Sequence, residues 1–314
     1  MPEFLAVFGA GASHGSDDPS GVPPLASDLL HELARVSPEW RSLRLGSWGD
    51  RFRLDFEQAM TDYAKLGGYS LPRLQRDMAR FFFTYRPGSR NLYLRLGTMV
   101  AETQEWNGAF ATLNYERLLP ISLWQAGVGF STPGLGRTAG RTGREVELCL
   151  PHGSCCLFLK SIRVRPGVSY VADVKFDDQV VAACDEATFR DNVERNAVTP
   201  VMCYFDRHKQ TSAGPTFIQV QRQRYADLVR EARAIAVVGL KVRRVDKHIW
   251  EPLAQTKADI VYCAGESAGK AFTKWAKENR PAGNSTVLDG YFEEHFDDIG
   301  LALGLTGKGG RLLP

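Results

Sequence analysis

The sequence predicts an α/β protein in which a Rossmann-like parallel sheet is covered by helices on both faces. Three short apolar runs support this prediction, FLAVF (4–8), AIAVVGLKV (234–242) and ADIVYCAG (258–265). They show little alternation of polar and apolar residues, which is typical of strands buried on both faces. Amphipathic helical patterns separate the later runs, and strands that alternate with helices indicate a parallel sheet.

The first apolar run is followed by a turn of small residues, GAGAS (9–13), and by a proline-containing loop. Residues 31–104 are rich in Arg, aromatic residues and Leu at helical spacing, and they predict a helical insertion that forms a small lobe. The strand pattern returns at GAFATLNY (108–115), and the chain then forms two strands around the Pro-His-Gly-Ser turn at 151–154. We therefore expect one Rossmann-like domain made of residues 1–30 and 105–314, the insertion 31–104, and irregular excursions at 127–145 and 160–214.

The composition is that of an ordinary globular protein. Of its 314 residues 44% are hydrophobic and 24% are charged, and the net charge of +3 is too small to argue for direct nucleic-acid binding. No apolar run approaches the roughly 18 residues of a membrane helix, and the N-terminus lacks the basic region of a signal peptide. We expect a cytoplasmic protein without a membrane partner.

The cysteines predict no metal site. They stand at positions 149, 155, 156, 184, 203 and 263, and none forms the C-x-x-C pair that a structural zinc site usually uses. We interpret them as small, mostly buried hydrophobic side chains.

Two turns follow apolar strands and are built from small residues. Gly9, Ala10, Gly11, Ala12 and Ser13 come directly after the first strand, a context that suits a phosphate-binding turn, although a tight turn without a ligand remains the alternative. A second turn begins at Gly239 and Leu240 after a later strand, with Asp246 opening the next helix; the alternative is an ordinary turn and helix cap.

Polar side chains also follow two other strands. Thr112, Asn114 and Glu116 occupy alternate positions at the end of one strand, so we expect their side chains to point the same way. Burying three polar side chains in a core costs free energy unless they form hydrogen bonds or bind a ligand. The alternative is that Asn114 caps the next helix. His152 lies in the turn after another strand, where an inert, solvated histidine is the alternative. The carboxyl ends of parallel strands share one edge of a sheet, so we expect these groups to meet there.

The order of these motifs, GAGAS, GVPPL, TLNYE, PHGS and VVG with a following Asp, resembles the sirtuin family, and in particular the sirtuin-like NAD⁺ hydrolases of bacterial antiphage defence. The segment LDFEQAM (54–60) is similar to an acidic helix in the inserted lobe of the defence members. The resemblance implies that Asn114 and His152 are catalytic and lie around the nicotinamide ribose. It implies NAD⁺-binding roles for the residues Gly9, Ala10, Gly11, Ala12, Ser13, Pro23, Thr112, Glu116, Gly239, Leu240 and Asp246.

The chain departs from the family pattern at two points. The zinc-binding cysteine pairs of the protein deacylases are missing, and Glu116 stands where the family usually has Asp. The expected reaction is cleavage of NAD⁺ to nicotinamide and ADP-ribose without a metal, with Asn114 orienting a water molecule and His152 acting as general base. A cyclase that releases nicotinamide, an NAD⁺-dependent protein deacylase and a non-catalytic NAD⁺ or ADP-ribose binding module remain alternatives.

The resemblance also implies regulation and partners. An enzyme that depletes NAD⁺ is toxic to a healthy cell, so it has to stay inactive until it is triggered. In one branch of the defence family a short sirtuin-like protein assembles with a hexameric translocase ATPase. We therefore expect a homo-oligomer, with such an ATPase as a possible partner.

Overall fold

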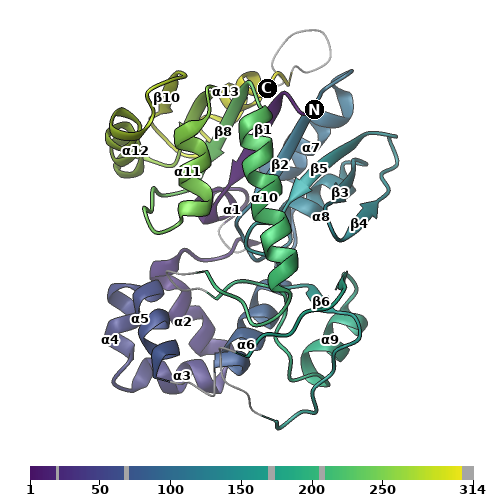
Figure 1. The fold of residues 1–314 in the computed structure, drawn as a ribbon, viewed down its shortest axis with the longest axis vertical. Helices are drawn as coiled ribbons and strands as arrows, with labels where there is room; N and C mark the ends of the chain where they lie inside the picture. Colours follow the sequence, from purple (N-terminus) through teal and green to yellow (C-terminus); the bar gives the residue numbers. More distant parts are fainter. Residues whose placement is uncertain (19–20, 67–70, 169–173, 205–208, 306–314) are drawn as a thin grey trace.

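The computed structural model describes residues 1–18, 21–66, 71–168, 174–204 and 209–305, and it confirms the predicted fold class. Its main element is an eight-stranded sheet with the strand order β10-β9-β8-β1-β2-β5-β3-β4 (Figure 1). The strands span β1 (Phe4–Phe8), β2 (Gly108–Thr112), β3 (Gly129–Thr132), β4 (Gly136–Thr138), β5 (Glu145–Cys149), β8 (Ala234–Val238), β9 (Asp259–Cys263) and β10 (Ser285–Leu288).

All neighbouring strands of this sheet are parallel except β4, which pairs antiparallel with β3. The strand β1 lies between β2 and β8 and pairs with both along its whole length. After β1 the chain forms β2, β3, β4 and β5 on one side of β1. Helix α10 (Pro215–Glu231) then leads back to β8 on the other side of β1, and β9 and β10 follow beyond it. Ligands of open α/β sheets bind at such a reversal of strand order, outside the carboxyl ends of the strands.

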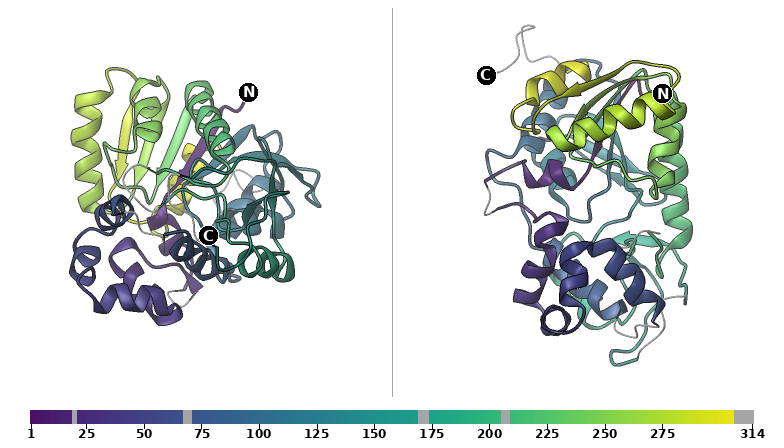
Figure 2. Two further views of the ribbon diagram at one scale, coloured as in Figure 1. Left: turned by 60° about the horizontal axis from the view of Figure 1, so that its bottom comes forward. Right: turned by 90° about the vertical axis from the view of Figure 1, so that its left-hand side faces the viewer.

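Helices cover both faces of the sheet, as Figure 2 shows. Side chains of β1 alternate between two hydrophobic clusters: Leu5 and Val7 belong to one, and Ala6 and Phe8 belong to the other. The first cluster includes residues of α10, α11 (Lys247–Gln255) and α12 (Glu266–Asn279). The second includes residues of α7 (Leu92–Glu102), α8 (Leu118–Gln125) and α13 (Phe296–Ala302).

A second lobe lies beyond the carboxyl edge of the sheet (Figure 1). It contains the helices α2 (Ala26–Val36), α3 (Pro38–Leu45), α4 (Gly49–Leu54), α5 (Phe56–Lys65) and α6 (Leu71–Phe83). It also contains β6 (Leu157–Leu159), β7 (Val180–Ala182) and α9 (Glu186–Glu194). Two distant segments thus build this lobe, and the side chain of Gln75 on α6 donates to the backbone oxygen of Met202 over 2.5 Å.

The parts that we expected to be irregular contain regular structure. Residues 127–145 form β3 and β4, and residues 160–214 include β7 and α9. Helix α7 lies in the predicted insertion but packs on α8 beside the sheet, where a Cβ atom at Gly97 would come within 2.9 Å of the side chain of Ala126. No helix in the described part of the chain is long and apolar enough to span a membrane.

Candidate functional site

The segment Gly9–Ser13, predicted as a turn, consists of the N-cap Gly9 and most of the short helix α1 (Ala10–His14). This strand-to-helix turn is in direct backbone contact with the turn after β8. The amide of Gly11 donates to the backbone oxygen of Gly239 over 2.9 Å. A Cβ atom at Gly9 would lie 2.7 Å from that oxygen, and a Cβ atom at Gly239, which has a φ of +65°, would lie 1.9 Å from the amide nitrogen of Ala12. This close approach explains why the residues here are small, and φ > 0 favours glycine at position 239.

This contact also uses part of the predicted phosphate-binding backbone. The amide of Gly9 donates to the carbonyl oxygen of Val238 at the end of β8, and that of Gly11 donates to Gly239 in the second turn. The amide of Ala12 donates to the oxygen of Gly9. Nevertheless, Ala10 is exposed, and Gly11, Gly239 and Leu240 are half-buried. The two predicted turns therefore meet at one edge of the sheet, and some of their residues are accessible there. Phosphate binding by this backbone stays a prediction.

Asn114 joins the ends of β1 and β2. Its side-chain nitrogen Nδ2 donates to the backbone oxygen of Gly9 over 3.1 Å and to Oγ of Ser13 over 2.8 Å. The backbone amide of Asn114 donates to Oγ1 of Thr112 over 3.2 Å, so Thr112 supports the turn. Both amide hydrogens of the side chain have acceptors, while its oxygen Oδ1 bonds to no residue in the described ranges. The carboxamide is thus held in one orientation.

Ser13 is the centre of a buried polar junction behind Asn114. Its hydroxyl donates to Oε1 of Glu116 over 2.6 Å and lies 2.9 Å from the hydroxyl of Tyr93. The other carboxylate oxygen of Glu116 accepts from the amide of Leu118. Burial raises the pKa of Glu116, and burial together with the Glu116 charge raises that of Tyr93. Glu116 therefore supports Ser13 and the start of α8, and a direct contact with NAD⁺ stays a prediction.

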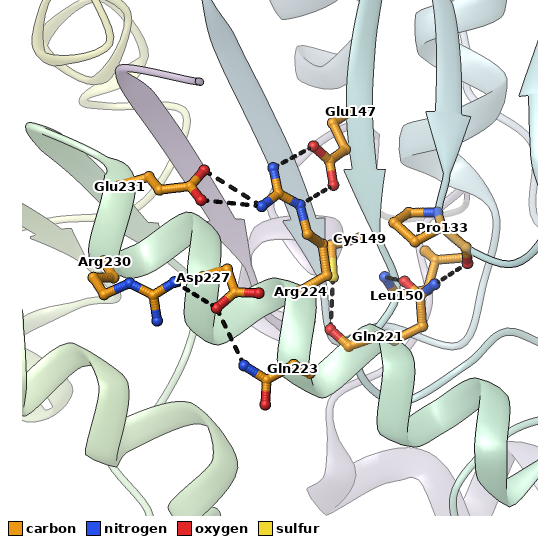
Figure 3. A network of polar contacts seen from close by, with 10 residues as sticks. All are labelled: Pro133, Glu147, Cys149, Leu150, Gln221, Gln223, Arg224, Asp227, Arg230 and Glu231. Carbon is orange, nitrogen blue, oxygen red and sulfur yellow. Dashed lines mark hydrogen bonds and ion pairs between the residues drawn. The ribbon is translucent and has the colours of Figure 1, made fainter.

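His152 is positioned by the turn after β5. Gly153 next to it has a φ of +75°, and a Cβ atom there would lie 2.1 Å from the backbone oxygen of Val201. The Oε1 atom of Gln221 on α10 accepts from the amide of Leu150 over 2.7 Å, and its Nε2 atom donates to the oxygen of Pro133 (Figure 3). The end of β5 is therefore fixed against α10.

The loops after β2 and β5 are bonded to each other through Tyr115. Its backbone oxygen accepts from the amide of Cys155 over 2.8 Å and from the hydroxyl of Ser154 over 3.1 Å. The ring of Tyr115 lies 6.3 Å from that of His152 between centroids. The structure thus brings the loops of Gly9, Asn114 and His152 together at one edge of the sheet.

The imidazole of His152 is buried and contacts a second histidine. Its Nε2 atom lies 2.8 Å from Nε2 of His248, the second residue of α11. Burial and the nearby His248 hold the pKa of His152 well below its usual range, and burial with the positive charges of Arg222 and Lys209 lowers that of His248 to about 3. Both imidazoles are therefore neutral at neutral pH, and a neutral imidazole can act as a base.

Asp246 lies at the start of the same helix and is also buried. Its Oδ1 atom has no hydrogen-bond partner in the part of the chain that the structure describes. Burial raises its pKa, while the positive charge of Lys209 lowers it. An unpartnered buried oxygen fits the predicted role in ligand binding, although it points to no particular ligand.

Other predicted and unpredicted residues complete the region. Pro23 is buried, and its backbone oxygen lies 3.1 Å from Nδ1 of His14, which places it behind the turn after β1. The segment LDFEQAM contributes Glu57, which accepts from Lys209 over 2.8 Å and from Arg243 near the second turn. Glu57 therefore links the lobe to the edge of the sheet.

Sequence reasoning did not find His248, Lys209 or Tyr93. The position of His248 on the first turn of the helix that Asp246 opens could have indicated it, since both side chains lie near the carboxyl end of β8. Lys209 and Tyr93 lie far along the chain from the motifs, and no local pattern marks them.

Within the described residues, no group of three or more His, Cys, Asp or Glu side chains could hold a metal ion. The chain matches no model of a known protein family and no curated protein sequence.

Proposed function

We propose that the protein is a sirtuin-like NAD⁺ glycohydrolase, which cleaves NAD⁺ to nicotinamide and ADP-ribose. The observation that supports this best is the fixed carboxamide of Asn114, whose Nδ2 atom is bonded to Gly9 and Ser13 and whose oxygen remains for a ligand. Asn114 lies at the carboxyl ends of β1 and β2, next to the point between β1 and β8 where the strand order reverses. Open α/β sheets bind their ligands at such a point.

The reaction requires little acid catalysis, because nicotinamide leaves as a neutral molecule. Its transition state is a ribosyl cation, which needs a fixed oxygen nearby and a water molecule on the opposite face. Asn114 Oδ1 would orient this water, and such positioning can contribute several kcal/mol. His152 would take a proton from the water or from a ribose hydroxyl, which typically accelerates a reaction by about 10²–10⁴-fold.

The turns of Gly9–Ser13 and of Gly239 and Leu240 would hold the dinucleotide. Ala10 is exposed and Gly11, Gly239 and Leu240 are half-buried, whereas Asn114 and His152 are buried. The phosphates and the adenosine would therefore lie on the open edge, and the nicotinamide ribose would reach inward. Pro23, Thr112, Glu116 and Asp246 would then support the pocket rather than carry out the chemistry.

The test is incubation of the purified protein with NAD⁺ while free nicotinamide and ADP-ribose are measured by chromatography. Asn114→Ala and His152→Ala should each lower the release of nicotinamide by at least about 100-fold. Trp124→Ala, an exposed change on α8, is the matched control and should keep the wild-type rate. Absence of nicotinamide from the wild-type protein, alone and with neighbouring gene products, would contradict an enzyme and favour a binding module.

The identity of the products separates the remaining alternatives. A cyclic nucleotide product would indicate a cyclase, and consumption of an acyl-lysine peptide would indicate a deacylase.

We further propose that the enzyme is a triggered, NAD⁺-depleting effector of antiphage defence in the cytoplasm. It would act as a homo-oligomer with a hexameric translocase ATPase as its partner. A strict monomer that is fully active alone would contradict this part.

A further inference from the structure

His248 lies between the candidate base and a surface pocket. On one side its Nε2 atom is 2.8 Å from Nε2 of His152, and the ring centroids are 5.1 Å apart. On the other side it lines a pocket of about 290 Å³ between α10 and α11, to which Gln219 and Ala226 also contribute. The side chain is half-buried, so one side of the ring faces His152 and the other faces the pocket.

The two imidazoles share one hydrogen bond. Both are neutral at neutral pH, because burial and the nearby charges of Arg222 and Lys209 disfavour protonation. Two neutral rings at this distance need one N–H donor and one lone-pair acceptor. The backbone of Leu113 raises the pKa of His152, which is the effect of a carbonyl acceptor, because only an acceptor stabilises the protonated ring. Since Nε2 of His152 faces His248, such an acceptor favours a proton on Nδ1, and Nε2 is left to accept from His248.

We propose that His248 caps the base of the ligand-free enzyme, occupying the lone pair of His152 Nε2 until NAD⁺ displaces it into the neighbouring pocket. The proposal rests on the proposed NAD⁺ hydrolysis, and it names His248 as a positioning residue that acts on substrate affinity. A ribose hydroxyl or water must replace the imidazole N–H before His152 can take a proton from it. Breaking the hydrogen bond between His248 and His152 costs free energy when NAD⁺ binds, so His248 affects KM. The chemical step takes place after His248 has turned away, so His248 has little effect on kcat.

The kinetic test compares two substitutions of His248. His248→Ala removes the donor, and KM for NAD⁺ should fall by about two- to tenfold, the value of one hydrogen bond, while kcat changes by less than about twofold. His248→Gln retains an N–H donor at the end of its side chain and should keep a KM close to that of the wild type. Gln219→Ala lines the same pocket and serves as the control for changes of the pocket surface alone.

A substitution that fills the pocket should have the opposite effect. Ala226→Phe takes up the space into which His248 has to turn, so KM should rise while the hydrogen bond between the histidines remains. This variant leaves both histidines in place, which keeps the proposal testable if His248→Ala does not fold. A higher KM for His248→Ala, a kcat lowered more than about tenfold, or an unchanged KM for Ala226→Phe would overturn the cap.

A readout without turnover separates this proposal from the function on which it rests. Nitrogen-15 NMR of the histidine rings should show His152 protonated on Nδ1 in the ligand-free protein, with Nε2 as acceptor. Removal of the neighbouring ring in His248→Ala should raise the pKa of His152, since His248 lowers it. A proton on Nε2 of His152 in the ligand-free protein, or an unchanged pKa of His152 in His248→Ala, would overturn the cap even in an active enzyme. The expected spectra without NAD⁺ cleavage in any variant would overturn the proposed function, and with it the effect of His248 on NAD⁺.

Discussion

Replacing Ser13 with alanine removes the centre of the polar junction that holds Asn114. The hydroxyl is completely buried and contacts the side chains of Asn114, Glu116 and Tyr93 at 2.8, 2.6 and 2.9 Å. A hydrogen bond to a charged group contributes about 1.5–3 kcal/mol and a neutral one about 1 kcal/mol. The sum is an upper limit because the three groups can move toward one another. We therefore expect the free energy of unfolding to fall by about 3 kcal/mol at neutral pH.

The loss should depend on pH through Glu116. Burial raises its pKa in the folded protein, and the bond from Ser13 partly counteracts this. In Ser13→Ala the pKa therefore rises further. Between the unfolded and the folded pKa the folded state binds more protons than the unfolded state, so stability decreases as the pH rises through this window. The difference between variant and wild type should be larger at neutral pH than at pH 5.

Urea unfolding followed by tryptophan fluorescence measures both effects. Ser27→Ala makes the same chemical change on the exposed side of α2, where the hydroxyl contacts Asp28, and it should alter stability by less than about 0.5 kcal/mol. A loss below about 1 kcal/mol for Ser13→Ala, or a loss that is equal at both pH values, would refute the reasoning about this junction.

Two substitutions test the supports of His152, and a pH profile tests its protonation. Gln221→Leu removes one buried and one partly buried hydrogen bond and should lower the free energy of unfolding in urea by about 2 kcal/mol. Gln223→Leu on the exposed side of the same helix should change it by less than about 0.5 kcal/mol. Gly153→Ala requires a backbone shift because Cβ would lie 2.1 Å from the oxygen of Val201, and a loss of at least about 2 kcal/mol is expected in the same assay. Since the pKa of His152 lies well below its usual range, its base form persists as the pH falls, and nicotinamide release should stay constant from pH 8 to pH 6; a decline centred near pH 6.5 would contradict this.

The sequence was sufficient to predict the sheet and the edge at which the motifs meet. Apolar runs such as 4–8 and 234–238 identify buried parallel strands, and parallel strands place their carboxyl ends on one side. The lobe was harder to predict, because β7 and α9 lie about a hundred residues beyond the helices that they join. The apolar residues of β7 and α9 find the side chains on which they pack only in the folded chain.

The polar contacts of the site could be predicted only in part. Alternation along a strand predicted that Thr112, Asn114 and Glu116 share a side, but β2 ends at Thr112. Alternation therefore does not govern Asn114 and Glu116, nor could it predict which side chains are bonded within the protein. Glu116 reaches Ser13 and the start of α8, so its carboxylate serves a structural contact. The approach of His248 to His152 depends on the packing of both α11 and β5 against α10, which no local pattern encodes.

The contact between the two glycine turns limits which substitutions can test nucleotide binding. Positions 9 and 239 require glycine because each turn packs on the backbone of the other. A Cβ atom at Gly9 would lie 2.7 Å from the oxygen of Gly239, and one at Gly239 would lie 1.9 Å from the nitrogen of Ala12. Substitution of either glycine would displace β1 relative to β8 whether or not a nucleotide binds between them, so a loss of activity would not identify the ligand. The exposed Ala10 has no such role in packing. A bulkier side chain at Ala10 should therefore weaken NAD⁺ binding while leaving the urea midpoint unchanged, and an unchanged affinity would exclude the dinucleotide from this turn.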